Sequence, residues 1–236
     1  MTAIILQARI DSTRLPGKAL LLLDGKPLLL RVMEALNHVP ADLRILACPD
    51  DSQSSFAPLA KEAGYKLFTG PKEDVLERYC QAIRRFSIKR IIRATGDNPF
   101  VFADAATAIN AEAIALKADY SSYSGMPVGA GVESILASAL GHIKTPTAFD
   151  QEHVCPYLYT HPDFFHLHRP LAPVRWQGPN IRLTVDTQED FNRAEKLYAV
   201  LENEPLRYHG PAIIAAYISL FGSIPDPFSK KHKAAR

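Results

Sequence analysis

The sequence predicts an α/β protein built on a mainly parallel sheet. Short apolar runs at 3–7, 44–48 and 90–94 each end near polar or turn residues, as buried strands do. Helical patterns lie between them, at 27–38 and 74–86. Strands that alternate with helices form parallel sheets covered on both faces.

The helical segments show one apolar face each. The first is expected to begin at Pro27, because the fixed φ of proline suits a first helical turn. The apolar face of the second consists of Val75, Leu76, Tyr79, Ile83 and Phe86. A last strand is expected at 182–186, followed by a helix over 188–201 with Phe191, Ala194, Leu197 and Leu201 on one face.

The pattern changes between these parts. We expect one domain over 1–226, in which 1–120 forms the first half, 121–180 an inserted arm or small lobe, and 181–226 a return to the core. Residues 227–236 form a basic tail without apolar residues, which we expect to be disordered. The arm is rich in proline and aromatic residues, and we expect a dimer interface from its aromatic cluster of Trp176, Tyr157, Tyr159, Phe164 and Phe165.

Composition excludes several classes of protein. The 236 residues include 27 basic and 25 acidic side chains, so no overall field favours nucleic acid. Cys48, Cys80 and Cys155 are odd in number and form no CxxC, which argues against a disulfide framework and a structural zinc site. No apolar run approaches the ~20 residues of a membrane span. We expect a cytoplasmic, soluble protein without nucleic-acid or membrane partners.

Three cations follow the first expected strand. In the stretch IILQARIDSTRLPGKAL, Arg9, Arg14 and Lys18 lie in a loop that precedes a helix. Ligands of parallel sheets bind outside the carboxyl ends of strands, where loop amides can point at phosphate oxygens. Arginine can hold a phosphate by two hydrogen bonds, and lysine adds a mobile charge. The loop predicts a site for a polyphosphate, with a solvated basic loop as the alternative.

Two common phosphate-binding motifs are absent from the sequence. A Walker A loop requires GxxxxGK[ST], whereas this chain offers only Pro16-Gly17-Lys18-Ala19. A dinucleotide fingerprint requires GxGxxG, and the nearest match, GAGVES at 129–134, lacks the third glycine.

Two aspartates follow strand-like runs. Asp97 follows RIIRAT and Asp186 follows IRLTV, so a parallel sheet would bring both to the edge where the first loop lies. Magnesium typically uses one or two carboxylates and takes its other oxygens from water and substrate phosphates. The pair predicts a metal site, and a turn or helix-cap role is the alternative for each residue alone.

Five segments together resemble one family. They are QARIDSTRLPGKAL at 7–20, GPKEDVLERY at 70–79, RATGDNPF at 93–100, EHVCPY at 152–157 and RLTVDTQEDF at 182–191. In this order they resemble the cytidylyltransferases that make CMP-activated sugars, of the acylneuraminate and spore-coat-polysaccharide-biosynthesis type. The resemblance covers about residues 1–200.

The resemblance implies a fold and an activity. The fold would be a glycosyltransferase-A-like, Rossmann-type three-layer sandwich, with nucleotide bound by 1–120 and acceptor and dimer contacts made by 121–180. The protein would be a nucleotidyltransferase that moves CMP from CTP, with Mg²⁺, to a sugar, sugar acid or similar acceptor for cell-surface polysaccharide biosynthesis, releasing pyrophosphate. It would form a homodimer.

The resemblance also implies roles for individual residues. The nucleotide-binding set is Gln7, Ala8, Arg9, Ser12, Arg14, Lys18, Gly70, Asp74, Thr95 and Gly96. The catalytic set is Arg14, Lys18, Asp97 and Asp186, of which the two aspartates would bind the metal. The acceptor set is Glu133, Glu152 and His153.

One departure and several alternatives remain. Similar sequences commonly carry an arginine directly before the Glu-His pair, where this chain has Gln151. If that arginine binds an anionic acceptor, the acceptor of this protein is expected to differ from theirs. Asp74 and Arg78, four residues apart, form either a structural ion pair or part of the nucleotide site. Two alternatives for the function remain: a glycosyltransferase with a nucleotide-sugar donor, and a non-catalytic nucleotide-binding relative. The sequence has no Asp-x-Asp triplet after a strand, which argues against the glycosyltransferase.

Overall fold

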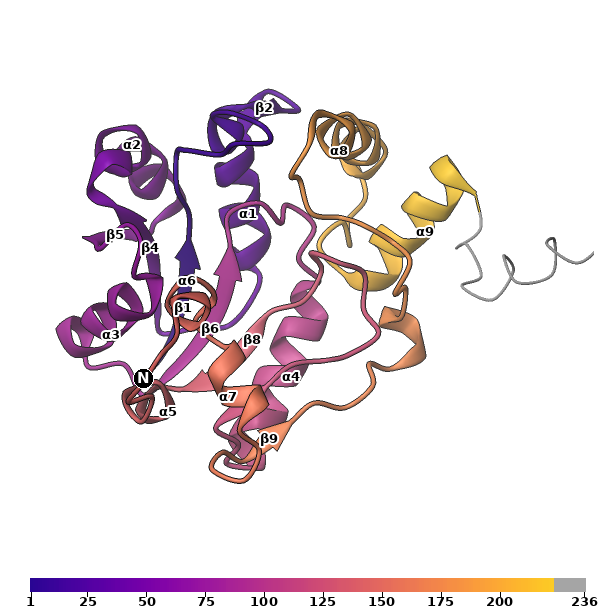
Figure 1. Ribbon diagram of the computed structural model, residues 1–236. Helices are drawn as coiled ribbons and strands as arrows, with labels where there is room; N and C mark the ends of the chain where they lie inside the picture. The colour runs from indigo at the N-terminus through magenta and orange to yellow at the C-terminus, as the bar shows by residue number, and fades with distance from the viewer. Residues whose placement is uncertain (223–236) are drawn as a thin grey trace, which may run out of the picture.

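A seven-stranded sheet runs through the middle of the molecule in the order β5-β4-β1-β6-β8-β7-β9 (Figure 1). The computed structural model describes residues 1–222. The strands of this sheet are β1 (Thr2–Gln7), β4 (Leu43–Pro49), β5 (Lys66–Gly70), β6 (Arg90–Thr95), β7 (Tyr120–Ser121), β8 (Glu133–Leu136) and β9 (Leu167–His168). A separate hairpin pairs β2 (Leu22–Leu23) with β3 (Lys26–Pro27).

One half of the sheet is parallel. β1 pairs in parallel with β4 and with β6, and β4 pairs in parallel with β5. Beyond β6 the direction changes, because β8 runs antiparallel to both β6 and β7, while β9 is parallel to β7. The expected strands at 3–7, 44–48 and 90–94 are confirmed. Because they are parallel neighbours, their carboxyl ends lie at the same edge of the sheet.

Helices follow the strands and cover both faces of the sheet (Figure 1). The α-helices are α1 (Leu28–Asn37), α2 (Gln53–Ala63), α3 (Val75–Phe86), α4 (Ala103–Ala115), α5 (Ala137–Gly141), α6 (Ala148–His153), α7 (Pro156–Thr160), α8 (Gln188–Leu201) and α9 (Gly210–Phe221). Short 3₁₀ helices are η1 (Lys18–Leu20), η2 (Asp50–Ser52) and η3 (Val174–Trp176). The helices expected at 27–38, 74–86 and 188–201 are confirmed within one or two residues.

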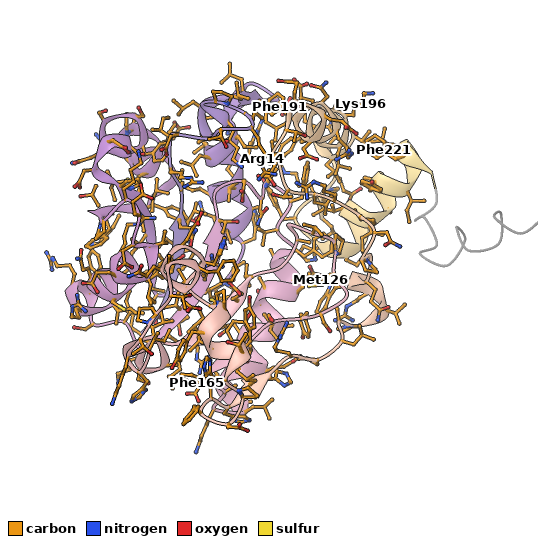
Figure 2. All side chains as sticks on the ribbon, in the orientation of Figure 1. Arg14, Met126, Phe165, Phe191, Lys196 and Phe221 are labelled. Atoms are coloured by element: carbon orange, nitrogen blue, oxygen red, sulfur yellow. The ribbon has the colours of Figure 1, made fainter. Side chains whose placement is uncertain are left out.

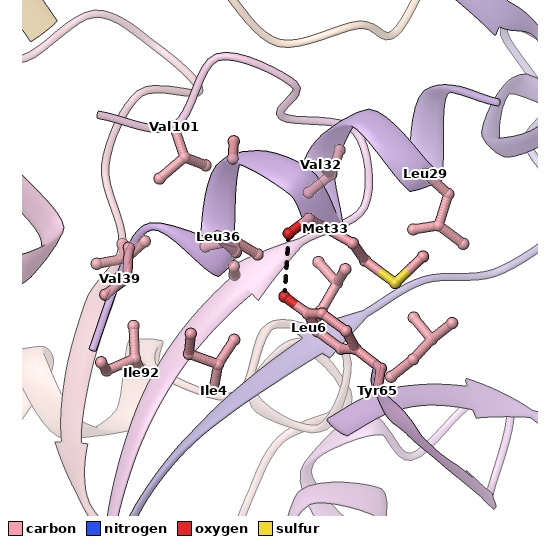
Figure 3. Packing of buried hydrophobic residues seen from close by; sticks show 14 of the residues in the cluster. Ile4, Leu6, Leu29, Val32, Met33, Leu36, Val39, Tyr65, Ile92 and Val101 are labelled. Atoms are coloured by element: carbon pink, nitrogen blue, oxygen red, sulfur yellow. Dashed lines mark hydrogen bonds between the residues drawn. The ribbon is translucent and has the colours of Figure 1, made fainter. Parts of the chain in front are cut away.

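The alternation of side chains along β1 divides the core in two. Ile4 and Leu6 point to the face covered by α1, α2 and α4, where they pack against residues such as Met33 (Figure 3). On this face Tyr65 donates a hydrogen bond from its hydroxyl to the carbonyl of Met33, at 3.4 Å. Ala3 and Ile5 point to the other face, which α3, α5 and α7 cover. Apolar residues on both sides of a strand are typical of parallel sheets.

A third apolar cluster lies beside the sheet. It joins the β2–β3 hairpin, α8 and α9, which lie away from α2, α3 and β5 in Figure 1. Trp176 belongs to this cluster and is only 2% exposed, so its predicted place in a dimer interface is wrong. Its indole Nε1 donates to the carboxylate of Asp104 at 2.7 Å, which satisfies the polar end of the buried ring. Of the same aromatic group, Phe164 is 80% exposed.

The predicted strand at 182–186 is wrong. This segment is extended, but it makes one isolated parallel bridge, between Val128 and Arg182, and no ladder. Its backbone donates three hydrogen bonds to the neighbouring backbone: Leu183 N and Thr184 N bond to Val128 O at 2.8 and 3.2 Å, and Val185 N bonds to Asp97 O at 2.8 Å. The alternation of apolar residues indicates only that these side chains are buried. Here they are buried in the third apolar cluster, and the segment does not pair with a neighbouring strand.

The region expected to form an arm, 121–180, contributes β8 and β9 to the same sheet. The three cysteines are free thiols. Within residues 1–222, no helix combines the length and apolar character needed to cross a membrane. The predicted basic tail lies outside the described residues.

Candidate active site

A cavity of about 280 Å³ opens at the carboxyl ends of β1 and β6. The loop after β1 forms one wall, and Figure 2 shows Arg14 of this loop among the side chains. Six cationic side chains line the cavity, namely Arg9, Arg14, Lys18, Lys72, Arg78 and Arg93. Four carboxylates share it, those of Asp11, Asp97, Glu152 and Asp186. Such a concentration of cations favours a polyanionic ligand.

The loop after β1 is anchored at both ends. Ile10 donates its backbone N–H to the hydroxyl of Ser52 at 3.1 Å, and Leu15 is buried in the third apolar cluster. The N–H of Lys18 then bonds to the carbonyl of Leu15 at 3.2 Å, which starts the short helix η1. These contacts hold both ends of the loop against the rest of the fold, so that its cations lie over the cavity.

Gly96 lets the end of β6 approach this loop. Its N–H bonds to the carbonyl of Gln7 at 2.8 Å. A Cβ atom at position 96 would lie 2.8 Å from the Cβ of Ala8, closer than side chains pack. The absence of a side chain therefore brings the loop and the residue that follows, Asp97, into one site.

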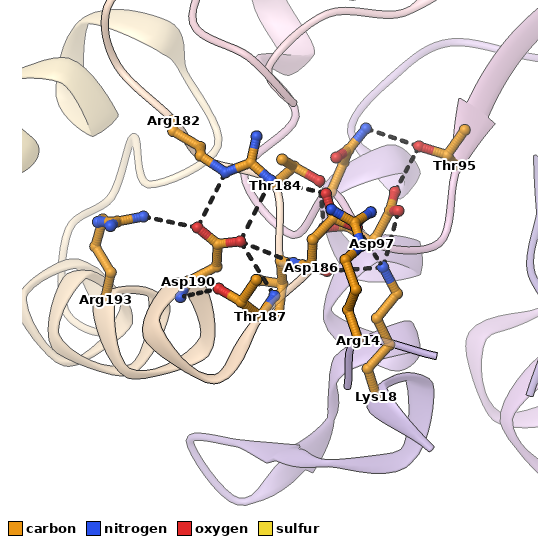
Figure 4. Close-up of polar contacts among 12 residues, drawn as sticks. Arg14, Lys18, Thr95, Asp97, Arg182, Thr184, Asp186, Thr187, Asp190 and Arg193 are labelled. Atoms are coloured by element: carbon orange, nitrogen blue, oxygen red, sulfur yellow. Dashed lines mark hydrogen bonds and ion pairs between the residues drawn. The ribbon is translucent and has the colours of Figure 1, made fainter. Parts of the chain in front are cut away.

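Lys18 joins the two predicted metal ligands (Figure 4). Its ammonium group lies 3.1 Å from Oδ2 of Asp97 and 2.9 Å from Oδ1 of Asp186. It also donates to the carbonyl of Val185 at 2.8 Å. Two segments that lie 79 and 168 residues after Lys18 in the chain therefore meet at its nitrogen.

Each carboxylate is oriented by further contacts (Figure 4). Asp97 accepts a hydrogen bond from the hydroxyl of Thr95 at 2.7 Å. Asp186 is paired with Arg14 at 3.0 Å and with Arg182 at 2.8 Å. Burial acts to raise the pKa of Asp186, but the hydrogen bond and charge of Lys18, with the charges of both arginines, outweigh it and hold this pKa below its usual value.

The two carboxylates suit a divalent cation. Their oxygens already converge on one positive centre at 2.9 and 3.1 Å. Within residues 1–222, no group of three or more His, Cys, Asp or Glu side chains is arranged to hold a metal. An ion at Asp97 and Asp186 would therefore complete its shell from water and ligand phosphates, as Mg²⁺ commonly does.

Arg78 lines the cavity, and of the two roles expected for it, a structural ion pair with Asp74 or a part of the nucleotide site, the structure rules out the first. The structural pair with Asp74 does not form, since Asp74 caps α3 by accepting the N–H of Glu77 at 2.8 Å. Arg78 instead donates to the carbonyl of Pro71 at 2.7 Å and lines the cavity, with its buried Nε unpartnered. Burial lowers its pKa.

Arg93 and Glu133 form a partly buried ion pair across β6 and β8. Burial acts to raise the pKa of Glu133, but the charge of Arg93, with hydrogen bonds from Tyr120 and Arg93, outweighs it and lowers the pKa. The hydroxyl of Tyr120 donates to Glu133 at 2.7 Å. Arg93 was not predicted as a site residue, although an arginine inside an expected central strand was a signal for a buried partner.

Most of the predicted site residues lie around the first cavity. It is lined by Gln7, Ala8, Arg9, Ser12, Arg14, Lys18, Thr95, Gly96, Asp97, Glu152, His153 and Asp186. The structure does not bring Gly70 or Asp74 into its lining, and Glu133 lines a second cavity. Lys72, which sequence reasoning did not single out, also lines the first cavity and pairs with Asp11 and Asp51, both at 2.8 Å. Gln151 donates its amide N–H to Asp74 at 3.2 Å.

Comparison with known proteins agrees with this architecture. The family model described as "Cytidylyltransferase" matches residues 3–212. The spore coat polysaccharide biosynthesis protein SpsF of Bacillus subtilis (strain 168) is 33% identical over 210 residues, which cover 85% of this chain and 88% of that protein.

Solved structures share the fold. A cytidylyltransferase from Leptospira borgpetersenii aligns with a TM-score of 0.85 at 22% identity, over 94% of this chain and 95% of that one. CMP:2-keto-3-deoxy-manno-octonic acid synthetase, solved in complex with CTP, aligns with a TM-score of 0.65 at 16% identity, over 84% and 98% of the two chains.

These likenesses confirm the glycosyltransferase-A-like, Rossmann-type fold. The family match spans nearly the whole described chain and includes every residue that meets at Lys18. The chain therefore belongs to the cytidylyltransferase family, and it is a nucleotidyltransferase.

Proposed function

We propose that this protein transfers CMP from CTP to a hydroxyl group of a sugar or similar small acceptor and releases pyrophosphate. The convergence of Lys18, Asp97 and Asp186 inside a cation-lined cavity carries the proposal. The family match and the CTP complex of a neighbour with the same fold support CTP as the donor. The name of the B. subtilis relative supports a role in cell-surface polysaccharide synthesis. The expected homodimer and cytoplasmic location remain part of the proposal.

The chain's cations would bind the phosphates of CTP. Arg9 and Arg14 lie on the exposed side of the first loop, where their guanidinium groups can each hold a phosphate by two hydrogen bonds. Lys72 lies on the same cavity. The donor would thus be held along its length by side chains that come from the loop after β1 and from the segment before α3.

Asp97 and Asp186 would hold Mg²⁺ between them. Bound there, the ion would polarise the α-phosphoryl group and add charge stabilisation. Lys18 occupies the point on which both carboxylates converge, so it would move from the carboxylates to the phosphates when the metal and CTP bind. In the structure Lys18 compensates the charge of both acids.

The reaction is a displacement at phosphorus. The acceptor hydroxyl would give its proton to a base, for which Glu152 and His153 are the candidates on this cavity. Its oxygen forms a bond to the α-phosphorus while the bond from that phosphorus to the bridging oxygen breaks, and pyrophosphate leaves with the bonding electrons. Arg14 and Lys18 would neutralise the charge that grows on the leaving group. Glu152 and His153, on the same cavity, and Glu133, on the adjacent one, are the candidates for contact with the acceptor.

The test of the donor is pyrophosphate release with Mg²⁺ and each of the four nucleoside triphosphates, against a panel of sugars, sugar acids and sugar phosphates. We expect release with CTP in the presence of an acceptor. Release of nucleoside diphosphate from a nucleotide-sugar would instead indicate glycosyl transfer.

The Asp97→Asn variant tests the metal assignment. An asparagine can still accept the hydrogen bond of Thr95, but it removes one of the two carboxylate charges, so we expect turnover to fall by ~10²-fold or more, the scale of losing one preorganised charge contact. Steady-state pyrophosphate release measures the effect. Asp42→Asn is the matched control, because Asp42 accepts the N–H of Thr2 at 2.7 Å and does not line the cavity. Unchanged turnover in Asp97→Asn would contradict the assignment.

A further inference from the structure

The two oxygens of each candidate metal ligand have different partners (Figure 4). Oδ2 of Asp97 and Oδ1 of Asp186 are the oxygens that lie 3.1 and 2.9 Å from Lys18. The other oxygen of Asp97, Oδ1, accepts a hydrogen bond from the hydroxyl of Thr95 at 2.7 Å. The other oxygen of Asp186, Oδ2, accepts one from Nη2 of Arg182 at 2.8 Å. Each carboxylate therefore has one oxygen on Lys18 and one that another side chain holds.

A buried acid holds Arg182 in its contact with Asp186 (Figure 4). The side chain of Arg182 is 40% exposed, and an exposed ion pair by itself contributes little. Here Nε and Nη2 also donate to the two oxygens of Asp190, at 3.0 and 3.3 Å. Asp190 is buried and is held in turn by Arg193 at 2.9 Å. Because the planar guanidinium bonds to two carboxylates at once, Nη2 is kept on Oδ2 of Asp186.

The hydroxyl of Thr95 is directed at Asp97 in a similar way. Nδ2 of Asn98 donates to Oγ1 of Thr95 at 2.8 Å. Because Oγ1 accepts this hydrogen bond, its own proton is free for Oδ1 of Asp97. Each carboxylate is thus oriented by a donor that a further residue orients. Such outer contacts commonly tune how a protein binds a metal.

This division of the oxygens limits how the two acids can bind a cation. When Lys18 moves away, one oxygen of Asp97 and one of Asp186 become available. A bidentate contact by Asp186 would have to take Oδ2 from Arg182 and leave an N–H of the guanidinium without its partner. Ca²⁺ takes about six to eight oxygens and often uses bidentate carboxylates, whereas Mg²⁺ requires an octahedron and keeps several waters. Two single oxygens therefore suit Mg²⁺ better than Ca²⁺.

We propose that Arg182 and Thr95 are positioning residues that each keep one carboxylate oxygen away from the metal, and that they thereby make the site discriminate against Ca²⁺ in favour of Mg²⁺. This inference rests on the proposed function, because it takes Asp97 and Asp186 as the metal ligands. It goes beyond that function by assigning the choice of ion to two residues that do not themselves bind the ion. The alternative for Arg182 is a purely structural role at the start of α8.

Metal binding by the full chain without nucleotide tests the inference. Mn²⁺ is the reporter, because its free form gives an electron paramagnetic resonance signal that is lost on binding, and Mg²⁺ or Ca²⁺ is added to displace it. The measured quantity is the dissociation constant for Ca²⁺ divided by that for Mg²⁺. The titrations are made in the wild type and in the Lys18→Ala background, which lacks the cation that lies between the two acids.

Arg182→Gln removes the contact that holds Oδ2 of Asp186. The released oxygen can then bind the larger ion, so we expect the ratio to fall by at least ~10-fold, the lower end of the effects of residues that orient metal ligands. The lost positive charge strengthens the binding of both ions and cancels in the ratio. Arg193→Gln is the matched control, because Arg193 also pairs with Asp190 but has Glu189 rather than Asp186 as its second partner. It should keep the ratio of the wild type.

Thr95→Val is an independent test at the other carboxylate. Valine is similar in shape to threonine and lacks the hydroxyl, so Oδ1 of Asp97 is released and the ratio should again fall. Urea unfolding shows whether each variant is folded before it is titrated. If Arg182→Gln does not fold, Thr95→Val decides whether holding the second oxygen sets the choice of ion.

The outcomes separate this inference from the proposed function. An unchanged ratio in Arg182→Gln, or an equal fall in Arg193→Gln, would overturn the role of Arg182, and an unchanged ratio in Thr95→Val would overturn that of Thr95. Neither result bears on CMP transfer, which pyrophosphate release from CTP measures separately. Absence of Mn²⁺ binding in both backgrounds would contradict the metal site and this inference together. A lower ratio in both variants, without pyrophosphate release by the wild type, would support this inference and contradict CMP transfer.

Discussion

At the scale of single residues, the site depends on one cation shared by two acids. Lys18 makes hydrogen bonds to Asp97, Asp186 and the carbonyl of Val185, and all three partners come from later in the chain. Without a cation between them, the two carboxylates would repel each other. Lys18 therefore compensates the charge of both acids, and under the proposed function it would compete with a metal ion for the same position.

Replacing Lys18 separates its two roles. In Lys18→Ala we expect CTP to bind more weakly by ~1.5 to 3 kcal/mol, the scale of a hydrogen bond to a charged group. We also expect Mn²⁺ to bind more tightly in the absence of nucleotide, because the carboxylates lose their competing cation. Calorimetry with CTP and electron paramagnetic resonance with Mn²⁺ measure the two effects.

The control for this variant is Lys196→Ala, on the exposed side of α8. Figure 2 shows Lys196 at the edge of the molecule, and it is not among the residues that line the cavity. It should change neither binding constant. An unaltered dissociation constant for CTP in Lys18→Ala would exclude Lys18 from the phosphate site.

At the scale of elements, the start of α8 positions Asp186. Thr187 and Asp190 form a capping box, in which Asp190 also accepts the N–H of Asp186 at 3.1 Å (Figure 4). Arg182 bridges Asp190 and Asp186, with contacts of 3.0 and 2.8 Å. The helix end thus holds the extended segment 182–186 in the shape that aims Asp186 at Lys18.

This arrangement predicts a pH dependence of stability. Burial acts to raise the pKa of Asp190, but hydrogen bonds from Arg182, the backbone and Arg193 outweigh it and hold the pKa well below its usual value. Because the folded pKa is depressed, the contribution of Asp190 is present above the unfolded pKa of about 4 and is lost as pH falls below it. Between pH 5 and pH 3, the wild type should lose more stability than Asp190→Asn.

Urea unfolding at the two pH values measures this difference. At pH 7, Asp190→Asn should cost ~1 to 2 kcal/mol through the weakened cap. Glu189→Gln is the matched control, since Glu189 is an exposed acid of the same helix that pairs with Arg193. Glu189→Gln should keep the pH dependence of the wild type. An equal loss of stability between pH 5 and pH 3 in Asp190→Asn and in the wild type would contradict the assignment.

At the scale of the whole molecule, the third apolar cluster joins α8 and α9 to the site. Gly210, the first residue of α9, donates its N–H to Asp104 at 2.9 Å, and Asp104 also accepts the indole N–H of Trp176. A Cβ atom at position 210 would lie 2.5 Å from the ring of Phe102 and 2.6 Å from that of Trp176. Leu183 and Val185, directly before Asp186, pack in the same cluster.

Gly210→Ala should therefore destabilise the fold by ~1 to 3 kcal/mol, the cost of overpacking a filled core. Gly141→Ala is the matched control, because Gly141 lies in α5 and a Cβ there would meet nothing within 4 Å. Urea unfolding of both variants measures the effect. Equal midpoints would show that α9 can move to admit a methyl group, and would contradict this account of the cluster.

Much of the fold could be predicted because it depends on local periodicity. The strands β1, β4 and β6 and the helices α1, α3 and α8 repeat their apolar residues with the spacing of the element. The carboxyl ends of β1 and β6 then place the first loop and Asp97 at one edge. The segment 182–186 was misread because its alternation comes from burial beside α8 and α9, which periodicity cannot distinguish from a strand.

The sequence by itself determined the parallel half of the sheet, the cation-rich loop after its first strand, and the two aspartates as candidate site residues. Each of these features can be recognised from a short stretch of neighbouring residues. Only the tertiary structure decided that Arg93 and Glu133 neutralise each other, that Arg78 turns from Asp74 to the cavity, and that Trp176 is buried. These features depend on contacts between residues that lie far apart in the chain or on the burial of one side chain, and neither quantity is recorded in local sequence.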